Sequence, residues 1–273
     1  MNLLPALRRW LAPRRPAASA PAAGTGTAPP VVTLRYDTPV LPEAEERRIL
    51  AEVAPHTMVH ETGVAFYMNE TVRLIRNGVP GAVVECGVWR GGASLACLLA
   101  QRSAFGRVER PVWLLDSFEG LPPVTEKDGP LARTWQTGED AERFLDNCRA
   151  AEEEAHALMR RHGLSAQEAV ITKGWFRDTL PAVTQAVAGQ GIAMLRLDGD
   201  WYDSTLECLE ALEPLVAEEG IVIVDDYYAW DGCARAVHDY LSRHDLPYRL
   251  KSLPYNFGMY FVKRANRGSY EQF

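Results

Sequence analysis

The chain has 273 residues, of which 47% are apolar and 24% are charged, and this is the composition of an ordinary globular protein. The composition excludes a wholly disordered chain, a fibrous repeat and a coiled coil. The 36 acids outnumber the 29 basic residues, and a net charge of −7 argues against a general nucleic-acid binder, which must neutralise phosphates.

Residues 1–30 differ in composition from the rest of the chain. They hold six prolines, eight alanines and four arginines, and no acid. Prolines and arginines interrupt the apolar residues at the start, which argues against a secretory signal. We therefore expect a disordered arm over 1–30 and a folded domain over 31–273.

Short apolar runs and amphipathic stretches alternate along the rest of the chain. Helical spacing of apolar residues first predicts helices over 43–54 and 64–77. The apolar runs that follow lie at 83–88, 112–116, 169–173, 193–198, 221–225, 248–253 and 259–263. Further helices are predicted over 92–102, 139–162, 177–188, 204–217 and 232–243. This alternation predicts an α/β fold with a seven-stranded, mostly parallel sheet and helices on both faces. No helix separates the last two runs, so they should form an antiparallel hairpin.

The remaining general features point to a protein without a membrane span and without disulfides. No run of 18 apolar residues occurs, so nothing in the sequence is expected to cross a membrane. The five cysteines are widely spaced and form no CxxC pair, which argues against a zinc site and for reduced thiols in a cytosol.

Two strand ends carry features of a nucleoside site, because ligands of open α/β sheets bind beyond the carboxyl ends of the strands. The first run passes through Glu85 into Gly87 and Gly91, and a helix starts at once. Glycines let a ligand approach the backbone, and a helix N-terminus favours a polar or anionic group. The second run ends in Asp116, whose carboxylate can accept two hydrogen bonds from a ribose diol. The pair favours adenosine binding, and a tight turn with a helix-capping acid is the alternative.

Three acids end the fourth and fifth runs. Asp198 ends one, and Asp225 and Asp226 end the other. Adjacent carboxylates repel each other in a half-buried site, and a divalent cation offsets that repulsion. Three converging carboxylates suit Mg²⁺. One helix cap plus solvated acids is the alternative interpretation, and Asp203 or Ser204 is expected to cap the next helix.

Five segments in the same order resemble the macrocin O-methyltransferase family (TylF-like). They are VPGAVVECGVWRGGAS, LLDSFEGLPP, KGWFRDTLP, LRLDGDWYDSTLECLEAL and GIVIVDDYYAWDGCARAVHDYL, and the resemblance runs from about residue 57 to about 264. It implies a Rossmann-like methyltransferase core over 81–264 with an N-terminal helical cover over 31–80. It also implies a class I O-methyltransferase of natural product biosynthesis that depends on S-adenosylmethionine and Mg²⁺.

The resemblance assigns roles to residues of this chain. It implies S-adenosylmethionine-binding residues at Glu85, Gly87, Gly91, Asp116 and Ser117. It implies metal ligands at Asp198, Asp225 and Asp226, with Asp198 also a candidate general base. Trp201 stands where the family often has Met, a departure that leaves the metal ligands alone and concerns the acceptor pocket.

The chemistry of methyl transfer limits the chemical class of the acceptor. A hydroxyl nucleophile must be aligned and made basic enough, and coordination to Mg²⁺ lowers its pKa. We expect a small-molecule hydroxyl acceptor, namely a glycoside, a vicinal diol or a catechol-like compound, and a cytoplasmic homo-oligomer with no nucleic-acid partner and no membrane span. Two other functions stay open. One is a metal-dependent glycosyltransferase that uses Asp198 and Asp200 as a DxD site, and the other is a non-catalytic S-adenosylmethionine-binding protein.

Overall fold

The computed structural model describes residues 40–138, 146–253 and 258–264, so the arm predicted over 1–30 lies outside the described residues. The principal helices are α1 (Glu43–Val53), α2 (Glu61–Arg76), α3 (Gly92–Phe105), α4 (Gly129–Gln136), α5 (Glu152–Arg161), α6 (Phe176–Val187), α7 (Tyr202–Leu212) and α8 (Asp231–Arg243). The strands are β1 (Ala82–Cys86), β2 (Val112–Asp116), β3 (Ala169–Lys173), β4 (Ile192–Leu197), β5 (Val216–Val224), β6 (Lys251–Ser252) and β7 (Met259–Val262).

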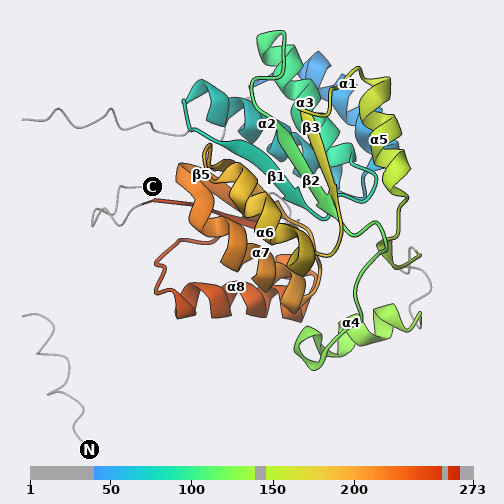
Figure 1. The fold of residues 1–273 in the computed structure, drawn as a ribbon, viewed down its shortest axis with the longest axis vertical. Coiled ribbons are helices and arrows are strands. Elements are labelled where there is room, and N and C mark those ends of the chain that lie inside the picture. Colours follow the sequence, from blue (N-terminus) through green and yellow to red (C-terminus); the bar gives the residue numbers. More distant parts are fainter. Residues whose placement is uncertain (1–39, 139–145, 254–257, 265–273) are drawn as a thin grey trace, which may run out of the picture. The chain divides into compact units, whose positions relative to one another are not determined.

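The strands form one seven-stranded sheet in the order β3-β2-β1-β4-β5-β7-β6 (Figure 1). β1 to β5 are parallel, whereas β7 pairs antiparallel with both β5 and β6. The predicted Rossmann-like architecture with its antiparallel C-terminal hairpin is thus confirmed. The strand order changes direction between β1 and β4, so the carboxyl ends of these two strands flank the topological switch point.

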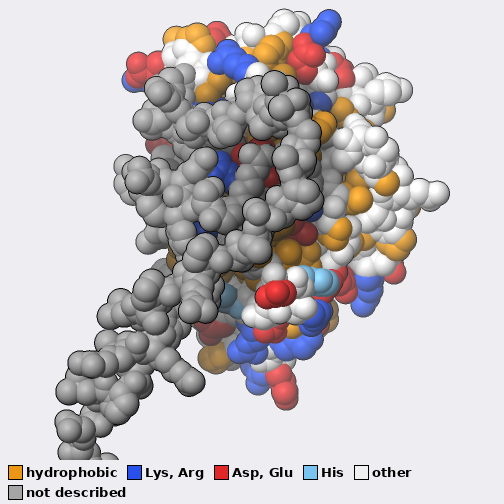
Figure 2. Space-filling model, turned by 90° about the vertical axis from the view of Figure 1, so that its left-hand side faces the viewer, with side chains coloured by type: hydrophobic (Ala, Val, Ile, Leu, Met, Phe, Trp, Pro, Cys, Tyr) orange, Lys and Arg blue, Asp and Glu red, His pale blue; other side chains and the backbone are white. Residues whose placement is uncertain are grey.

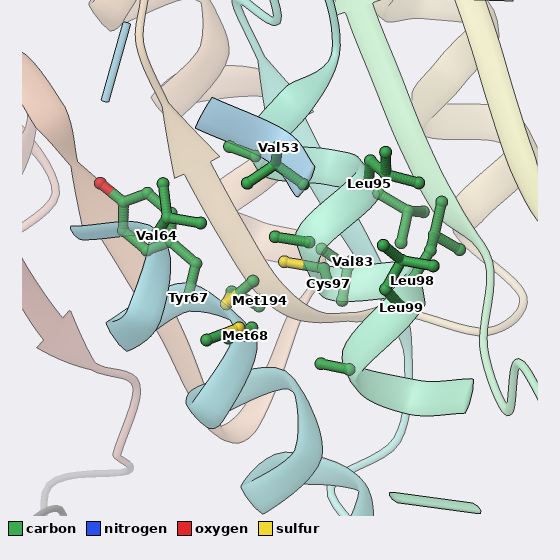
Figure 3. Packing of buried hydrophobic residues seen from close by; sticks show 14 of the residues in the cluster. Val53, Val64, Tyr67, Met68, Val83, Leu95, Cys97, Leu98, Leu99 and Met194 are labelled. Carbon is green, nitrogen blue, oxygen red and sulfur yellow. The ribbon is translucent and has the colours of Figure 1, made fainter. Parts of the chain in front are cut away.

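Helices cover both faces of the sheet, with α1, α2, α3 and α5 on one face and α6, α7 and α8 on the other (Figure 1). Successive strand side chains point to opposite faces, so Val83 joins the first core and Val84 the second. Figure 3 shows the first core, where Met68 of α2 and Leu98 of α3 pack near Val83 and Met194 of the sheet. These two cores hold the strand ends rigidly in register.

Many charged side chains lie on the described surface, in contact with solvent. On the face drawn in Figure 2, acidic and basic side chains are interspersed over the described part. Among the described residues, no helix has both the length and the apolarity needed to cross a membrane. All five cysteines are free, as the sequence predicted.

Three elements differ from the prediction. Of the helix predicted over 139–162, α5 forms only residues 152–161, a 3₁₀ turn with Asn147 in the left-handed region precedes it, and 139–145 lie outside the described residues. The helix predicted over 204–217 ends at Leu212, and β5 begins as early as Val216 after a turn that contains Pro214. Helix α4 was not predicted, although its early proline suits the first turn of a helix.

Candidate functional site

A cavity of about 530 Å³ lies at the carboxyl ends of β1, β2, β4 and β5. Six of the eight predicted site residues line it, namely Gly87, Asp116, Ser117, Asp198, Asp225 and Asp226. Trp89, Phe118 and Asp200 follow β1, β2 and β4 with φ angles of 51°, 55° and 55°. Non-glycine residues with such backbone angles concentrate at functional sites, so the strain observed here marks this end of the sheet.

Gly87 follows β1 with φ 88°, at the point where the chain passes between β2 and β4. Its N–H donates to the carbonyl of Leu115, and the carbonyl of Cys86 accepts from the N–H of Asp198, both at 2.8 Å. A Cβ on Gly87 would lie 1.8 Å from the backbone oxygen of Asp198. Only glycine therefore fits, and the bare backbone at this position faces the cavity.

Asp116 ends β2, and its carboxylate is almost fully engaged by backbone amides. Oδ2 accepts from the N–H groups of Val88 and Trp89 at 2.7 and 2.9 Å, and Oδ1 accepts from Phe118 at 2.7 Å. Burial raises the pKa of Asp116, and these amides oppose the shift. The neighbouring Ser117 makes a turn, donating to Gly120 at 3.0 Å. Asp116 thus ties the loop after β1 to the loop after β2.

Two predicted cofactor residues, Glu85 and Gly91, are not among those that line the cavity. Strand alternation turns Glu85 toward α3, where it is buried and bonds to Ser94 and Arg196. Gly91 starts α3 with φ 86°, and a Cβ there would lie 3.2 Å from Met159. Both residues thus hold structural positions beside the cavity, and their role as S-adenosylmethionine-binding residues stays a prediction.

Three carboxylates gather at the ends of β4 and β5. Asp198, Asp200 and Asp226 each place an oxygen within 4.8 Å of the others. Oδ2 of Asp226 accepts from the backbone N–H of Asp200 at 3.0 Å, and Trp230 Nε1 donates to Oδ1 of Asp200 at 2.8 Å. Asp198 and Asp226 were predicted ligands, whereas Asp200 was seen only as part of the competing DxD pattern.

The third predicted ligand, Asp225, lines the cavity but stands outside this group of three. Its Oδ1 accepts a hydrogen bond from the hydroxyl of Tyr67 and lies 3.3 Å from the guanidinium of Arg196. Asp225 follows Val224, which packs on the second core, so strand alternation turns the Asp225 side chain to the opposite face, toward α2. The structure therefore brings Asp200, rather than Asp225, to Asp198 and Asp226.

Burial and like charge raise the pKa values of Asp200, Asp225 and Asp226. Burial and then the charge of Asp198 raise the pKa of Asp200 to about 7. Burial and the charges of Asp200 and Asp198 raise the pKa of Asp226 well above its ordinary range. Burial raises the pKa of Asp225 to about 6, although Arg196 opposes this shift. When they are ionised, the carboxylates of Asp198, Asp200 and Asp226 repel one another, and a divalent cation offsets this repulsion.

Arg196, the penultimate residue of β4, lies beneath this group with its side chain only 3% exposed. Its guanidinium is 2.7 Å from Oδ2 of Asp198, pairs with Glu85, and lies 4.7 Å from the ring centre of Tyr67. Glu85 and Arg196 are register partners on adjacent strands. The sequence prediction missed Arg196, although a basic residue two positions before a candidate ligand was a visible signal.

The other end of the cavity is walled by the segment before α4, through Pro122, Pro123, Thr125 and Asp128. Asp128, buried at the start of α4, accepts from the backbone N–H of Tyr202 at 2.7 Å. It thus caps α7, which begins two residues earlier than Ser204. Asp203 does not cap the helix as predicted, because it lies inside α7 and bonds to Lys127 at 2.8 Å.

The loop between α1 and α2 lines the cavity through Met58 and Val59. It packs closely on the first turn of α3, since a Cβ on Gly92 would lie 2.5 Å from the carbonyl of His56. Met58 is 44% exposed and presents its apolar side chain at the cavity. The helices on either side cover the sheet, the loop lines the cavity, and Tyr67 of α2 reaches Asp225 at its edge.

Comparison with known proteins identifies relatives across most of the chain. Residues 41–263 match the macrocin-O-methyltransferase (TylF) family model. The 8-demethyl-8-(2,3-dimethoxy-alpha-L-rhamnosyl)-tetracenomycin-C 4'-O-methyltransferase of Streptomyces olivaceus is 40% identical over 222 residues, which are 80% of this chain and 79% of the relative. The mycinamicin III 3''-O-methyltransferase of Micromonospora griseorubida is 34% identical over 213 residues, 74% and 78% of the two chains.

A solved structure, that of the O-methyltransferase NovP, is similar with a TM-score of 0.65 and 34% identity, and the match covers 77% of this chain and 83% of that one. The family match spans every strand described above together with the acids at the strand ends. The sequence left two other functions open, a glycosyltransferase and a non-catalytic protein. The match to a family of O-methyltransferases supports neither of them. The chain belongs to the macrocin-O-methyltransferase (TylF) family and is a class I S-adenosylmethionine-dependent O-methyltransferase.

Proposed function

We propose that this enzyme methylates a sugar hydroxyl of a small natural product and that it requires Mg²⁺. The observation that carries the proposal is one cavity that joins a glycine turn and a strand-end acid to three clustered carboxylates. The relatives support the acceptor class, since their names describe O-methylation of a rhamnosyl-tetracenomycin and of mycinamicin III.

The cofactor end of the cavity is formed by Gly87, Asp116 and Ser117. Gly87 lines the cavity and carries no side chain, so S-adenosylmethionine can approach its backbone. Oδ2 of Asp116 already accepts from two backbone amides and Oδ1 from one, so one lone pair of Oδ1 remains to accept a hydrogen bond from a ribose hydroxyl. Glu85 and Gly91 lie beside this end of the cavity, where they fix the surrounding backbone.

Replacing Asp116 by asparagine is expected to weaken S-adenosylmethionine binding by about 10-fold or more. The amide would present an N–H₂ donor toward N–H groups that now donate to Oδ2, which leaves donors unsatisfied and loosens the loop that carries Trp89. Isothermal titration calorimetry with S-adenosylhomocysteine checks this result. Unchanged affinity in a variant with a normal melting temperature would remove Asp116 from the cofactor site.

The acid group fits a Mg²⁺ ion by its chemistry and its spacing. Asp198, Asp200 and Asp226 supply hard oxygen ligands, and oxygens bound to one Mg²⁺ lie at most about 4.2 Å apart. The observed limit of 4.8 Å between their oxygens needs only small side-chain movements to reach that spacing. We therefore propose these three residues as the ligands, with Asp225 as a charge partner of Arg196.

When bound, S-adenosylmethionine supplies an activated methyl group and Mg²⁺ lowers the pKa of a nearby hydroxyl. Asp198 accepts the hydroxyl proton, and Arg196 fixes the direction of its carboxylate by holding Oδ2 at 2.7 Å. The walls of the cavity hold the acceptor oxygen in line with the methyl group. Alignment of this kind contributes several kcal/mol, up to ~7–11 in the best cases.

The function is tested by incubating the full chain with S-adenosylmethionine, Mg²⁺ and a set of α-L-rhamnosides, with phenyl and tetracyclic polyketide aglycones, alongside a catechol. We expect a rhamnoside to gain the mass of one methylene on its sugar while S-adenosylhomocysteine accumulates. EDTA should abolish the transfer and added Mg²⁺ should restore it. Activity that survives thorough EDTA treatment refutes the metal requirement, and transfer to the catechol alone refutes the sugar assignment.

A further inference from the structure

Three tryptophans meet between α4 and the acid group. Trp135 of α4 lies edge-to-face against Trp201 with ring centres 5.9 Å apart, and Trp230 packs on both, 5.1 Å from Trp201. Trp201 is only 2% exposed, so it is the buried centre of this cluster. Aromatic pairs in this geometry stabilise their partners beyond simple burial.

Trp201 also makes a polar contact with the loop that leads to α4. Its Nε1 donates to the carbonyl of Pro122 at 3.0 Å. The adjacent residue, Tyr202, donates its backbone N–H to Asp128 at the start of α4. The wall segment 122–136 is therefore attached at its beginning, its middle and its end to the same two residues, Trp201 and Tyr202.

These attachment points directly follow two members of the acid group. Asp198 and Asp200 lie three residues and one residue before Trp201, and Asp200 accepts a hydrogen bond from Trp230, which packs on Trp201. The position of the wall relative to the acids thus depends on the packing of the Trp201 side chain together with the hydrogen bond from Tyr202 to Asp128.

We propose that Trp201 is a positioning residue that fixes the wall 122–136 relative to the acid group and so sets which acceptors fit. The inference rests on the proposed function, since it assumes that the acceptor lies between the wall and the acids. Trp201 is only 2% exposed yet borders the cavity, and it holds the wall through Trp135, Trp230 and Pro122. A smaller side chain leaves the Pro122 carbonyl without its donor and lets α4 shift.

The test uses the full chain with Trp201→Met, with Trp135→Leu as a second variant that breaks the same contact from the wall. Trp113→Phe is the matched control, because Trp113 packs on the second core and does not line the cavity. Amide hydrogen exchange is measured with S-adenosylhomocysteine present. Methyl transfer is measured with the phenyl and the tetracyclic rhamnosides, and kcat and KM are determined separately.

We expect Trp201→Met to speed exchange in α4 by about 10-fold or more while exchange in α3 stays within about twofold of wild type. The ratio of kcat/KM for the two rhamnosides should change by about 10-fold, chiefly through KM, and the affinity for S-adenosylhomocysteine should not change. Trp135→Leu should reproduce both effects, and Trp113→Phe should produce neither.

Unchanged exchange in α4 of Trp201→Met overturns the proposal whatever the acceptor is. Faster exchange with an unchanged rhamnoside ratio and unchanged KM values overturns the link to acceptor choice. If wild type methylates neither rhamnoside, the proposed function fails, and the exchange data still decide whether Trp201 positions the wall.

Discussion

Replacing Arg196 by methionine is expected to lower the free energy of unfolding by about 3–5 kcal/mol, the range observed when one partner of a buried ion pair is removed. The guanidinium faces Glu85, Asp198 and Asp225, and its side chain is only 3% exposed. Methionine has a similar length but no charge, so it leaves three carboxylates without their common partner. Urea unfolding followed by circular dichroism measures the change.

The pH dependence of this loss of stability distinguishes the contribution of the Arg196 charge from the contribution of its packing. Burial already raises the pKa of Glu85, and Arg196 opposes that rise. Without the guanidinium the folded-state pKa rises further above the unfolded value, so the fold binds protons more tightly. The variant should therefore lose more stability at pH 8 than at pH 5.

A surface arginine provides the control for the Arg196 substitution. Arg160 pairs with Glu153 on the exposed side of α5, with side chains 61% and 73% exposed. Arg160→Met should change stability by no more than about 0.5 kcal/mol. Arg196→Met should be less stable than Arg160→Met if Arg196 stabilises the fold through Glu85, Asp198 and Asp225. Equal stability of the two variants, unchanged between pH 5 and pH 8, contradicts this role of Arg196.

Replacing Asp226 by asparagine is expected to reduce turnover by about 100-fold or more and to abolish stabilisation of the fold by Mg²⁺. In wild type, Mg²⁺ at 100 times its dissociation constant should stabilise the fold by about 2.7 kcal/mol. For a domain of this size that corresponds to a rise in melting temperature of roughly 5–10 °C. Differential scanning fluorimetry with and without Mg²⁺ measures it.

The pH dependence of the Mg²⁺ effect follows from the raised pKa of Asp200, which burial and Asp198 bring to about 7. An acid whose pKa is raised by folding favours the fold when protonated, so this contribution is lost as the pH rises from about 4 to about 7. The metal-free enzyme should therefore be less stable at pH 8 than at pH 6. Mg²⁺ should stabilise it more at pH 8, because protons no longer compete.

Two further substitutions decide the third ligand of the proposed metal site. Asp200→Asn should weaken Mg²⁺ binding more than Asp225→Asn, because Oδ1 of Asp225 is already held by Tyr67 and Arg196. The reverse order would restore the set predicted from sequence. Asp203→Asn is the matched control, since Asp203 lines the same cavity but pairs with Lys127 outside the acid group, and it should keep the Mg²⁺ effect.

Most of the sheet and much of the site could be predicted because strand ends are local features of a sequence. Apolar runs located all seven strands, and the residues that follow them placed Gly87, Asp116 and Asp198 at one edge of the sheet. Parallel strands bring their carboxyl ends to the same edge, so this step required no knowledge of distances. The helix α4 and the early start of β5 were missed because their limits depend on contacts with other elements.

The sequence by itself determined the fold class, the family and the chemical types at the strand ends, since periodicity and motif order are properties of the chain. Only the tertiary structure decided which carboxylates share one space. It turned Glu85 inward to Arg196, placed Asp200 beside Asp226, and set Asp225 against Tyr67. The physical reason is that the direction of a side chain beyond a strand end depends on the backbone turn and on its charged neighbours. Those neighbours come from helices and strands far apart in the sequence.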